Sequence, residues 1–276
     1  MDNETNKRLP EISHPEVWTL ALHLSGSELK YAASSRVEDE SLTFGAVKLN
    51  GNEGKFVAEV ESAVYDNPFF LSQFGQTSIL VDSDKFLVIP DEMTAGCPEE
   101  CRRYFNYIFH ADHELMAVDR IEETGVSIAY SIDREIDSFL RRTFYNPPIL
   151  HSLTPLLRFL AKKEKFGTNG KTYAFLDKDC LRIIAFKSNR LVYANSFRFS
   201  NNDDAFYYVM NAWNACEMTN DSDELYLSGD KALKTYLLPN IREHIKFAAQ
   251  MIFPADMLRL GKDVMTAPFD LLTLQQ

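Results

Sequence analysis

"LALHLSGSELKYAAS", residues 20–34, is the stretch that decides how the rest of the chain is interpreted. Two short apolar runs flank Ser25, Gly26 and Ser27, which form a tight turn of small residues. Apolar runs on both sides of a glycine-containing turn predict a β-hairpin. Turns of this kind often hold phosphate, because glycine lets the backbone N–H groups approach the oxygens closely. The stretch therefore predicts a hairpin and raises the question of whether its turn binds phosphate.

The first half of the chain continues this hairpin with a mixture of strands and helices. Apolar alternation predicts extended segments, and helical spacing of apolar residues predicts helices. The predicted strands are 18–24, 28–34, 42–50, two strands within 78–90, 114–121 and 125–132. The predicted helices are 55–67, 98–109, 133–144 with Asp133 as its N-cap, and 153–164. The sequence PPIL, near 147–150, marks a boundary between two domains.

The second half repeats the order of elements found in the first. A hairpin is predicted at 172–177 and 180–187, a third strand at 190–199 and a helix at 203–217. A strand at 224–229, a helix at 230–240 and a strand within 244–252 follow. Each half therefore begins strand-strand-strand-helix-strand-helix, although the two halves share little sequence identity. We predict a leader at 1–15, a first α/β domain at 16–150 and a second at 151–276; the alternative is a mixed α/β protein without a repeat.

Composition limits the classes of protein to which the chain can belong. It has 276 residues, of which 45% are hydrophobic and 25% charged, enough for a folded core. Lys and Arg total 29 against 40 Asp and Glu, a net charge of -11 that opposes binding to nucleic acid or an anionic membrane. We find neither a signal peptide nor an apolar run of about 18 residues, so we expect no membrane span. Four cysteines without an export signal predict reduced thiols and a cytoplasmic protein.

Three short motifs carry a resemblance to a known fold. Residues 22–30 (LHLSGSELK) lie over a run like I-D-I-G-S-S-S-V-K, residues 177–179 over an Asp-x-Gly turn, and residues 228–230 over a strand that ends in Gly-Gly. With the repeat, these motifs resemble the duplicated ribonuclease-H-like (actin-like ATPase) fold, in two α/β domains whose mixed sheets each open with a hairpin. The nearest branch is that of bacterial cell-division and pilus-assembly actin homologues. The chain also resembles an uncharacterised bacterial family of unknown function assigned this fold.

The resemblance implies a nucleotide cleft between the two halves, but the motifs depart from the pattern that such a cleft needs. His23 replaces the first carboxylate, and a neutral imidazole is a poor ligand for Mg²⁺. Ser25 replaces a glycine, although Gly26 follows it. At the second turn Asp179 replaces the glycine and places a negative charge where a phosphate would lie. Asp230 replaces the last glycine and is suited to cap the next helix.

We therefore predict a non-catalytic scaffold or protein-interaction module with a degenerate nucleotide site, no cofactor and an unidentified protein partner. The alternative is a divergent Mg-ATP-binding ATPase or kinase-like enzyme. In that alternative the resemblance places Asp177 at the metal and Gly229 behind the nucleoside. The residues that it places at the phosphates are Ser25, Gly26, Ser27 and Lys30. The residues assigned to this degenerate cleft are Ser25, Gly26, Ser27, Lys30, Asp177, Asp179, Gly229 and Asp230.

Two other features have a functional and a structural interpretation. Cys97, Cys101, His110 and His113 nearly imitate a zinc site, but their spacing is wrong for one, so we expect no metal. The apolar tail TAPFDLLTLQQ, residues 266–276, is a candidate docking segment for a protein partner. The structural interpretation is that this tail packs on its own domain.

Overall fold

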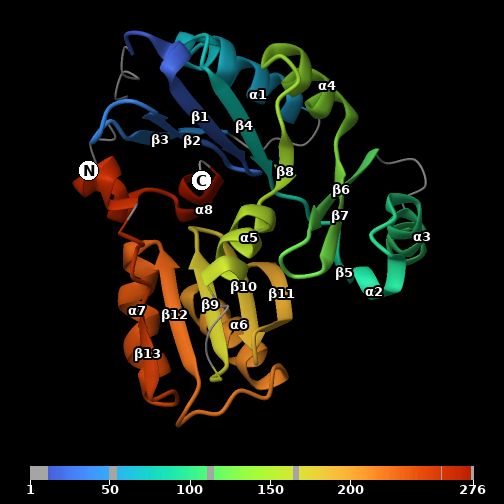
Figure 1. Cartoon of the computed structure of the whole chain (residues 1–276), viewed down its shortest axis with the longest axis vertical. Coiled ribbons are helices and arrows are strands. Elements are labelled where there is room, and N and C mark those ends of the chain that lie inside the picture. The colour runs from blue at the N-terminus through green and yellow to red at the C-terminus, as the bar shows by residue number, and fades with distance from the viewer. Residues whose placement is uncertain (1–11, 50–54, 111–114, 164–167, 256, 275–276) are drawn as a thin grey trace.

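The computed structural model describes residues 12–49, 55–110, 115–163, 168–255 and 257–274. Two five-stranded mixed sheets have the same strand order, and helices cover both (Figure 1). The first sheet is β3-β2-β1-β4-β8, with bounds Thr43–Lys48, Glu28–Ser35, Trp18–Leu24, Gln76–Val81 and Ile149–His151. The second is β11-β10-β9-β12-β13, with bounds Arg190–Arg198, Cys180–Lys187, Lys171–Leu176, Glu224–Gly229 and Phe247–Gln250. The predicted duplicated α/β fold is confirmed.

Strand direction is also the same in the two sheets. In each sheet the first three strands form an antiparallel meander, and the remaining two strands run parallel to the first. The quoted stretch is the β1–β2 hairpin, in which Leu24 pairs with Leu29 across the turn. Its counterpart is the β9–β10 hairpin, in which Leu176 pairs with Leu181. Most of the predicted leader lies outside the described residues.

Eight α-helices are assigned within the part of the chain that the structure describes. Their bounds are α1 Phe56–Tyr65, α2 Asp91–Thr94, α3 Pro98–Phe109, α4 Arg134–Thr143, α5 Leu153–Lys163, α6 Asn202–Ala215, α7 Lys231–Arg242 and α8 Phe269–Leu274. Asp133 caps α4 as predicted, because its carboxylate accepts from the backbone N–H groups of Glu135 and Ile136. None of the helices described here has the length and apolar character that a membrane crossing requires.

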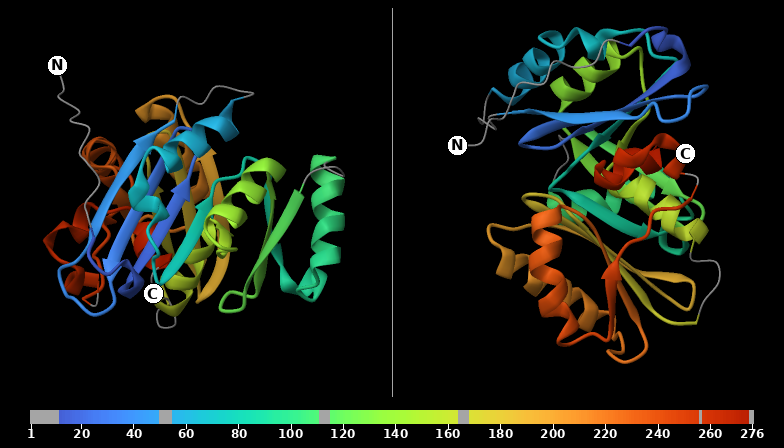
Figure 2. Two further views of the ribbon diagram at one scale, coloured as in Figure 1. Left: turned by 90° about the horizontal axis from the view of Figure 1, so that it is seen from above. Right: turned by 90° about the vertical axis from the view of Figure 1, so that its left-hand side faces the viewer.

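A third sheet interrupts the repeat in the first half. Its order is β5-β7-β6, with bounds Phe86–Pro90, Val126–Ile132 and Leu115–Ile121. With α2 and α3 it forms a small layer beside the first sheet (Figures 1 and 2). The counterpart of α7 is therefore α4, which precedes the last strand of the first sheet, β8, as α7 precedes β13, and not the predicted helix at 98–109. The sequence pattern does not reveal this insertion, because α3 occupies the place in the order of elements where the repeat predicts a helix.

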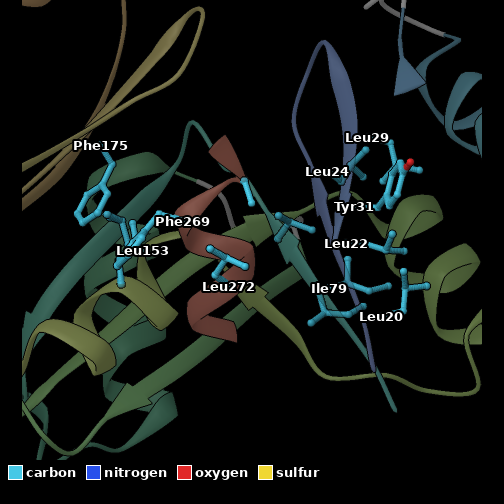
Figure 3. Close-up of a cluster of buried hydrophobic side chains, with 14 of the residues drawn as sticks. Leu20, Leu22, Leu24, Leu29, Tyr31, Ile79, Leu153, Phe175, Phe269 and Leu272 are labelled. Atoms are coloured by element: carbon cyan, nitrogen blue, oxygen red, sulfur yellow. The ribbon is translucent and has the colours of Figure 1, made fainter. Parts of the chain in front are cut away.

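Successive side chains of a strand point to opposite faces of the sheet, so each central strand packs against a layer on each side. On β1, Leu20 and Leu22 belong to the large core beneath the helices, whereas Ala21 contacts Leu271 of α8 on the opposite face. On β9, Phe175 belongs to that same large core, which extends from the first sheet to the second (Figure 3). Because Ala21 is small, α8 lies close to the sheet. His23 follows Ala21 by two residues and therefore shares the α8 face.

Candidate functional site

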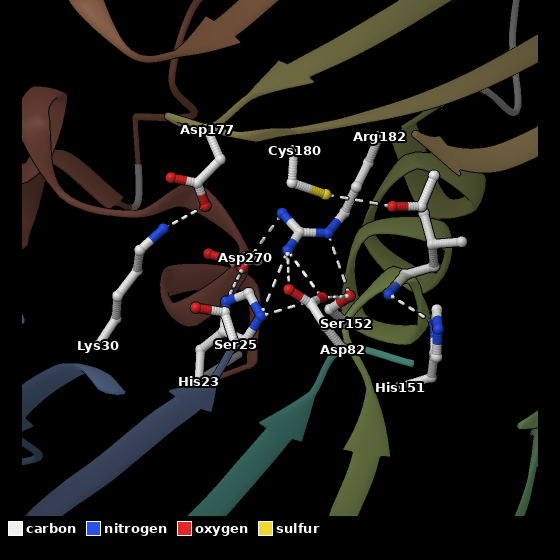
Figure 4. Close-up of polar contacts among 12 residues, drawn as sticks. His23, Ser25, Lys30, Asp82, His151, Ser152, Asp177, Cys180, Arg182 and Asp270 are labelled. Carbon is white, nitrogen blue, oxygen red and sulfur yellow. Dashed lines mark hydrogen bonds and ion pairs between the residues drawn. The ribbon is translucent and has the colours of Figure 1, made fainter. Parts of the chain in front are cut away.

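The turns of the two equivalent hairpins lie against each other and exchange ion pairs. Lys30 of β2 pairs with Asp177, which ends the β9 side of the second hairpin (Figure 4). In the reverse direction, Lys178 Nζ donates to Glu28 Oε1 at 2.6 Å. Each hairpin thus supplies one cation and one carboxylate to the other. This reciprocal contact joins the two halves where the hairpin turns face the space between them.

A cluster of four buried charges lies behind these pairs (Figure 4). His23 lies between two carboxylates, with Nε2 3.2 Å from Asp82 Oδ1 and Nδ1 2.7 Å from Asp270 Oδ2. Arg182 of β10 donates from Nη2 to Asp82 Oδ1 at 2.9 Å, and its Nη1 lies 3.8 Å from Asp270 Oδ2. The Ser152 hydroxyl donates to Asp82 at 2.6 Å and accepts from Arg182 Nε at 3.1 Å. Both large sheets and α8 therefore meet at this cluster.

The charges of the cluster balance when His23 is protonated. Burial alone would lower the pKa of His23, but Asp82 and Asp270 outweigh burial and raise that pKa to about 9. Burial would raise the pKa of Asp82, yet the charges of Arg182 and His23 hold it well below its usual value. A protonated imidazole has no free lone pair. Nδ1 of His23 faces Asp270, and Nε2 lies 3.2 Å from both Asp82 Oδ1 and Arg182 Nη2, so both ring nitrogens are engaged within the cluster.

A cleft of about 580 Å³ opens between the two halves above this cluster. Four of the predicted residues line it, namely Lys30, Asp177, Gly229 and Asp230. Lys30 and Asp177 are paired with each other across the floor of the cleft. Between the two hairpins, the groups that the resemblance assigns to phosphate and metal are thus bound to one another.

The predicted residues Ser25 and Gly26 line a different pocket, of about 320 Å³, next to residues 82–85. The backbone N–H and the hydroxyl of Ser25 both donate to the carbonyl of Glu28, each at 3.0 Å. The N–H of Glu28 in turn donates to the Ser25 hydroxyl at 3.1 Å. The polar groups of Ser25 are therefore used to close the hairpin turn.

Ser27 and Asp179 do not line either of these two pockets among the described residues. The carbonyl of Ser27 accepts from the N–H of Leu49 at 2.7 Å, which holds the turn against the end of β3. The half-exposed carboxylate of Asp179 lies 3.6 Å from Arg198 Nη1. Neither residue lines the cleft that Lys30 and Asp177 share.

The loop after β12 is shaped by packing and capping. Asp230 Oδ1 accepts from the N–H of Leu233 at 2.8 Å, so the predicted N-cap of α7 is confirmed. Gly229 has a φ of +100°, and a Cβ there would lie 2.0 Å from the carbonyl oxygen of Leu176. Glycine is therefore required at this position by the close approach of β9.

The cysteine and histidine series is spread over the length of α3. Cys97 is the N-cap and His110 the C-cap of this helix of 12 residues, so about 18 Å separates its ends. His113 lies outside the described residues. Among the residues that the structure describes, no group of three or more His, Cys, Asp or Glu side chains is placed to hold a metal ion.

The C-terminal tail packs on the chain itself. Leu271 and Leu272 of α8 are fully buried, and Phe269 lies against Phe175 and Phe253 with ring centroids 5.6 and 5.1 Å away. The candidate docking role of residues 266–276 is therefore wrong for the segment through 274, because its apolar side chains already have partners. The same helix carries Asp270 into the charge cluster.

A family model matches most of the sequence. It covers residues 9–247 and describes a protein of unknown function (DUF3822). The chain belongs to the DUF3822 family. No match is found among the curated proteins.

Solved structures similar to this DUF3822 chain share its architecture. A Bacteroides thetaiotaomicron protein with an actin-like ATPase fold and unknown function has a TM-score of 0.75 at 22% identity, over 94% of this chain and 96% of that one. The PilM-PilN type IV pilus biogenesis complex matches with a TM-score of 0.52 at 10% identity, over 93% of this chain and 96% of that one. These likenesses confirm the actin-like ATPase fold and the resemblance to a family of unknown function with that fold.

Sequence reasoning identified His23 but missed the residues that surround it in this DUF3822 chain. Arg182 is the charged residue within the apolar run CLRIIAF, residues 180–186, which becomes the buried part of β10. Asp82 directly follows the apolar strand β4, and Asp270 lies within the apolar tail. A charge inside an apolar run signals a buried partner of opposite sign. That signal was present, but only the tertiary structure identifies the partner of each charge.

Proposed function

We propose that this DUF3822 protein is a non-catalytic interaction module with an actin-like fold, in which ion pairs between its own side chains occupy the floor of the cleft. The single observation that carries the proposal is the reciprocal ion pairing of the two hairpins, Lys30 with Asp177 and Lys178 with Glu28. In the resembled fold this space between the hairpins belongs to the phosphates. Here Lys30 and Lys178, the two lysines on the floor of the cleft, already have carboxylate partners.

Electrostatics favour the self-paired state over a bound triphosphate. To enter the floor, phosphates would have to displace Asp177 and Glu28 from Lys30 and Lys178. The displaced carboxylates would then lie beside the phosphates, and like charges about 4 Å apart repel by roughly 4 kcal/mol at an effective dielectric near 20. Mg²⁺ bridging the phosphates would relieve this repulsion, but the position at which the resemblance places one of its carboxylates holds His23. The proposal therefore includes no cofactor.

The interaction role and the location of the module rest on separate observations. One structural neighbour is the PilM-PilN type IV pilus biogenesis complex, an assembly of two proteins. Four free cysteines, two of them buried, suit a reducing compartment, so we place the module in the cytoplasm. The partner we propose is a protein, and the net charge of -11 argues against nucleic acid.

Nucleotide binding provides the test. We would measure thermal unfolding of the purified chain with millimolar Mg-ATP, Mg-ADP or buffer, together with the release of phosphate from ATP. A ligand present at 100 times its dissociation constant would add about 2.7 kcal/mol, or roughly 5–11 °C in the unfolding midpoint. We expect no such shift and no hydrolysis above the buffer rate.

The Mg-ATP alternative makes the opposite prediction in the same experiment. A saturable shift of the unfolding midpoint that disappears in Asp177→Asn would establish the ATPase or kinase-like alternative. It would overturn the proposal that ion pairs keep phosphate out of the floor of the cleft. For the interaction role, proteins captured by the immobilised chain would be compared with and without Mg-ATP. We expect the same partner in both, and a partner that binds only with nucleotide would contradict the proposal.

A further inference from the structure

The part of the cleft above the ion-paired floor has an apolar wall of aromatic side chains. The Phe269 ring stacks on Phe175 with centroids 5.6 Å apart and meets Phe253 edge-on at 5.1 Å. These three rings and Met251 all line the cleft, and they come from β9, the segment after β13 and α8. Each of these four side chains is at most 8% exposed, so the wall presents the edges of buried apolar groups to the cleft, whose volume of about 580 Å³ is that of a small-molecule site.

Two lysines face this wall from the first turn of α7. Lys231 and Lys234 are three residues apart, so they lie on the same side of the helix, and both line the cleft. Lys234 is half-buried, and its burial lowers its pKa, an effect that the nearby charge of Asp230 only partly offsets. The carboxylate of Asp230 is engaged as the helix cap. The cation of Lys234 is thus partly desolvated beside an apolar surface.

The charges around the cleft leave a small positive excess. Among the described residues that line it, five side chains are basic and four are acidic. On the floor, Lys30, Lys178 and Arg182 lie beside Asp177, Glu28 and Asp270 and are matched in number. The remaining positive charge lies at Lys231 and Lys234, of which Asp230 offsets one. The excess therefore matches one negative charge and not the several charges of a nucleoside triphosphate.

We propose that the cleft binds a small organic monoanion with a flat apolar body, such as an aromatic carboxylate or sulfonate. The apolar body lies on the wall of Phe175, Phe253 and Phe269, and the anionic group lies beside Lys234. The inference rests on the proposed function in one respect, because a floor closed to phosphate leaves this upper part of the cleft as the space for a ligand. It goes further by naming the chemistry that this space accepts.

The test uses two fluorescent probes that share an aromatic body and differ in charge. Anilinonaphthalene sulfonate is a monoanion, and N-phenylnaphthylamine is its uncharged counterpart. We expect the anion to bind the full chain at one site, about tenfold more tightly than the uncharged probe, because a partly desolvated ion pair adds to apolar burial. Equal affinity for the two probes, or no saturable binding of the anion, would overturn the proposal.

Variants assign the binding to the cleft. We expect Lys234→Met to weaken the anion about tenfold and leave the uncharged probe unchanged, whereas Lys55→Met, at an exposed lysine outside the cleft, changes neither. Thr235→Trp fills the cleft from an exposed position on α7 and should abolish binding while the unfolding midpoint is retained. Full binding in both Lys234→Met and Thr235→Trp would place the probe elsewhere and refute the inference.

Competition separates this inference from the proposed function. Mg-ATP and sodium sulfate would be added at matched ionic strength to the complex with anilinonaphthalene sulfonate. We expect equal, small effects from both. Saturable displacement of the probe by Mg-ATP but not by sulfate would overturn the proposal that the protein binds no nucleotide. If the wild-type chain bound neither the anionic probe nor Mg-ATP, only the monoanion site would be overturned.

Discussion

Replacing Asp270 with Asn removes one of the two carboxylates that surround His23 and leaves the shape of the side chain unchanged. Removing one partner of a buried ion pair costs about 3–5 kcal/mol, because the other charge stays buried without compensation. His23 can relieve part of this cost by releasing its proton, and the rise of its pKa from 6.5 to about 9 is equivalent to on the order of 3 kcal/mol. We therefore expect Asp270→Asn to lower the free energy of unfolding by about 3 kcal/mol at pH 7.

The dependence on pH follows from the direction of the shift. Because the pKa of His23 is higher in the folded state, its contribution to stability is complete below pH 6.5 and is lost as the pH rises through about 9. The wild-type protein should thus lose on the order of 3 kcal/mol across that window. Asp270→Asn should lose less across it, because one of the two charges that hold the proton on His23 is absent.

Thermal unfolding between pH 6 and 10, followed by circular dichroism, measures both effects. At pH 7 the midpoint should fall by roughly 6–12 °C, since each kcal/mol is worth about 2–4 °C in a chain of this size. Asp263→Asn is the matched control, because Asp263 is an exposed carboxylate in the same C-terminal segment and should change the midpoint little. If Asp270→Asn left the midpoint and the pH profile like those of wild type, the four-charge cluster would not contribute as reasoned here.

Three further predictions test the cleft and the fold. In a double-mutant cycle, Lys30→Met and Asp177→Asn should show a coupling of about 1–2 kcal/mol in unfolding free energy, and additivity would mean that the hairpins are not joined by this pair. Gly229→Ala should destabilise the chain by about 3 kcal/mol or more, because its Cβ would overlap a carbonyl of β9 at a positive φ, and wild-type stability in chemical denaturation would contradict that geometry. Dithionitrobenzoate should react first with Cys97 and Cys216, which are partly exposed, and should react with all four cysteines only in denaturant. Fast reaction of all four thiols in the native protein would contradict the burial of Cys101 and Cys180.

Most of the fold could be predicted because the signals were local. The hairpin around Gly26, the capped helix that begins after Asp133 and the strand that ends at Gly229 each follow from period, turn and cap chemistry within a short window. The repeat of three strands, helix and strand was sufficient to indicate the duplicated architecture. The third sheet was missed because pairing between strands is non-local, and alternation does not reveal which strand is the neighbour of another.

The candidate site was predictable only in part. The sequence indicated that His23, Asp179 and Asp230 depart from a phosphate-binding pattern, and Asp230 caps a helix as expected. It did not indicate that Lys30 and Asp177, assigned to phosphate and metal by resemblance, pair with each other across the cleft. These two residues are separated by 147 positions, so no local rule relates them.

The sequence by itself determined the elements of this protein, the equivalence of its two hairpins and the histidine at position 23, where the resemblance implies a carboxylate, because propensity and motif are properties of neighbouring residues. Only the tertiary structure decided which groups surround this histidine. Folding brings β1, β4, β10 and α8 together, so that His23, Asp82, Arg182 and Asp270 neutralise one another inside the protein. The physical reason is that a buried charge needs a partner at close range, and the chain supplies that partner from segments that meet only in the folded state.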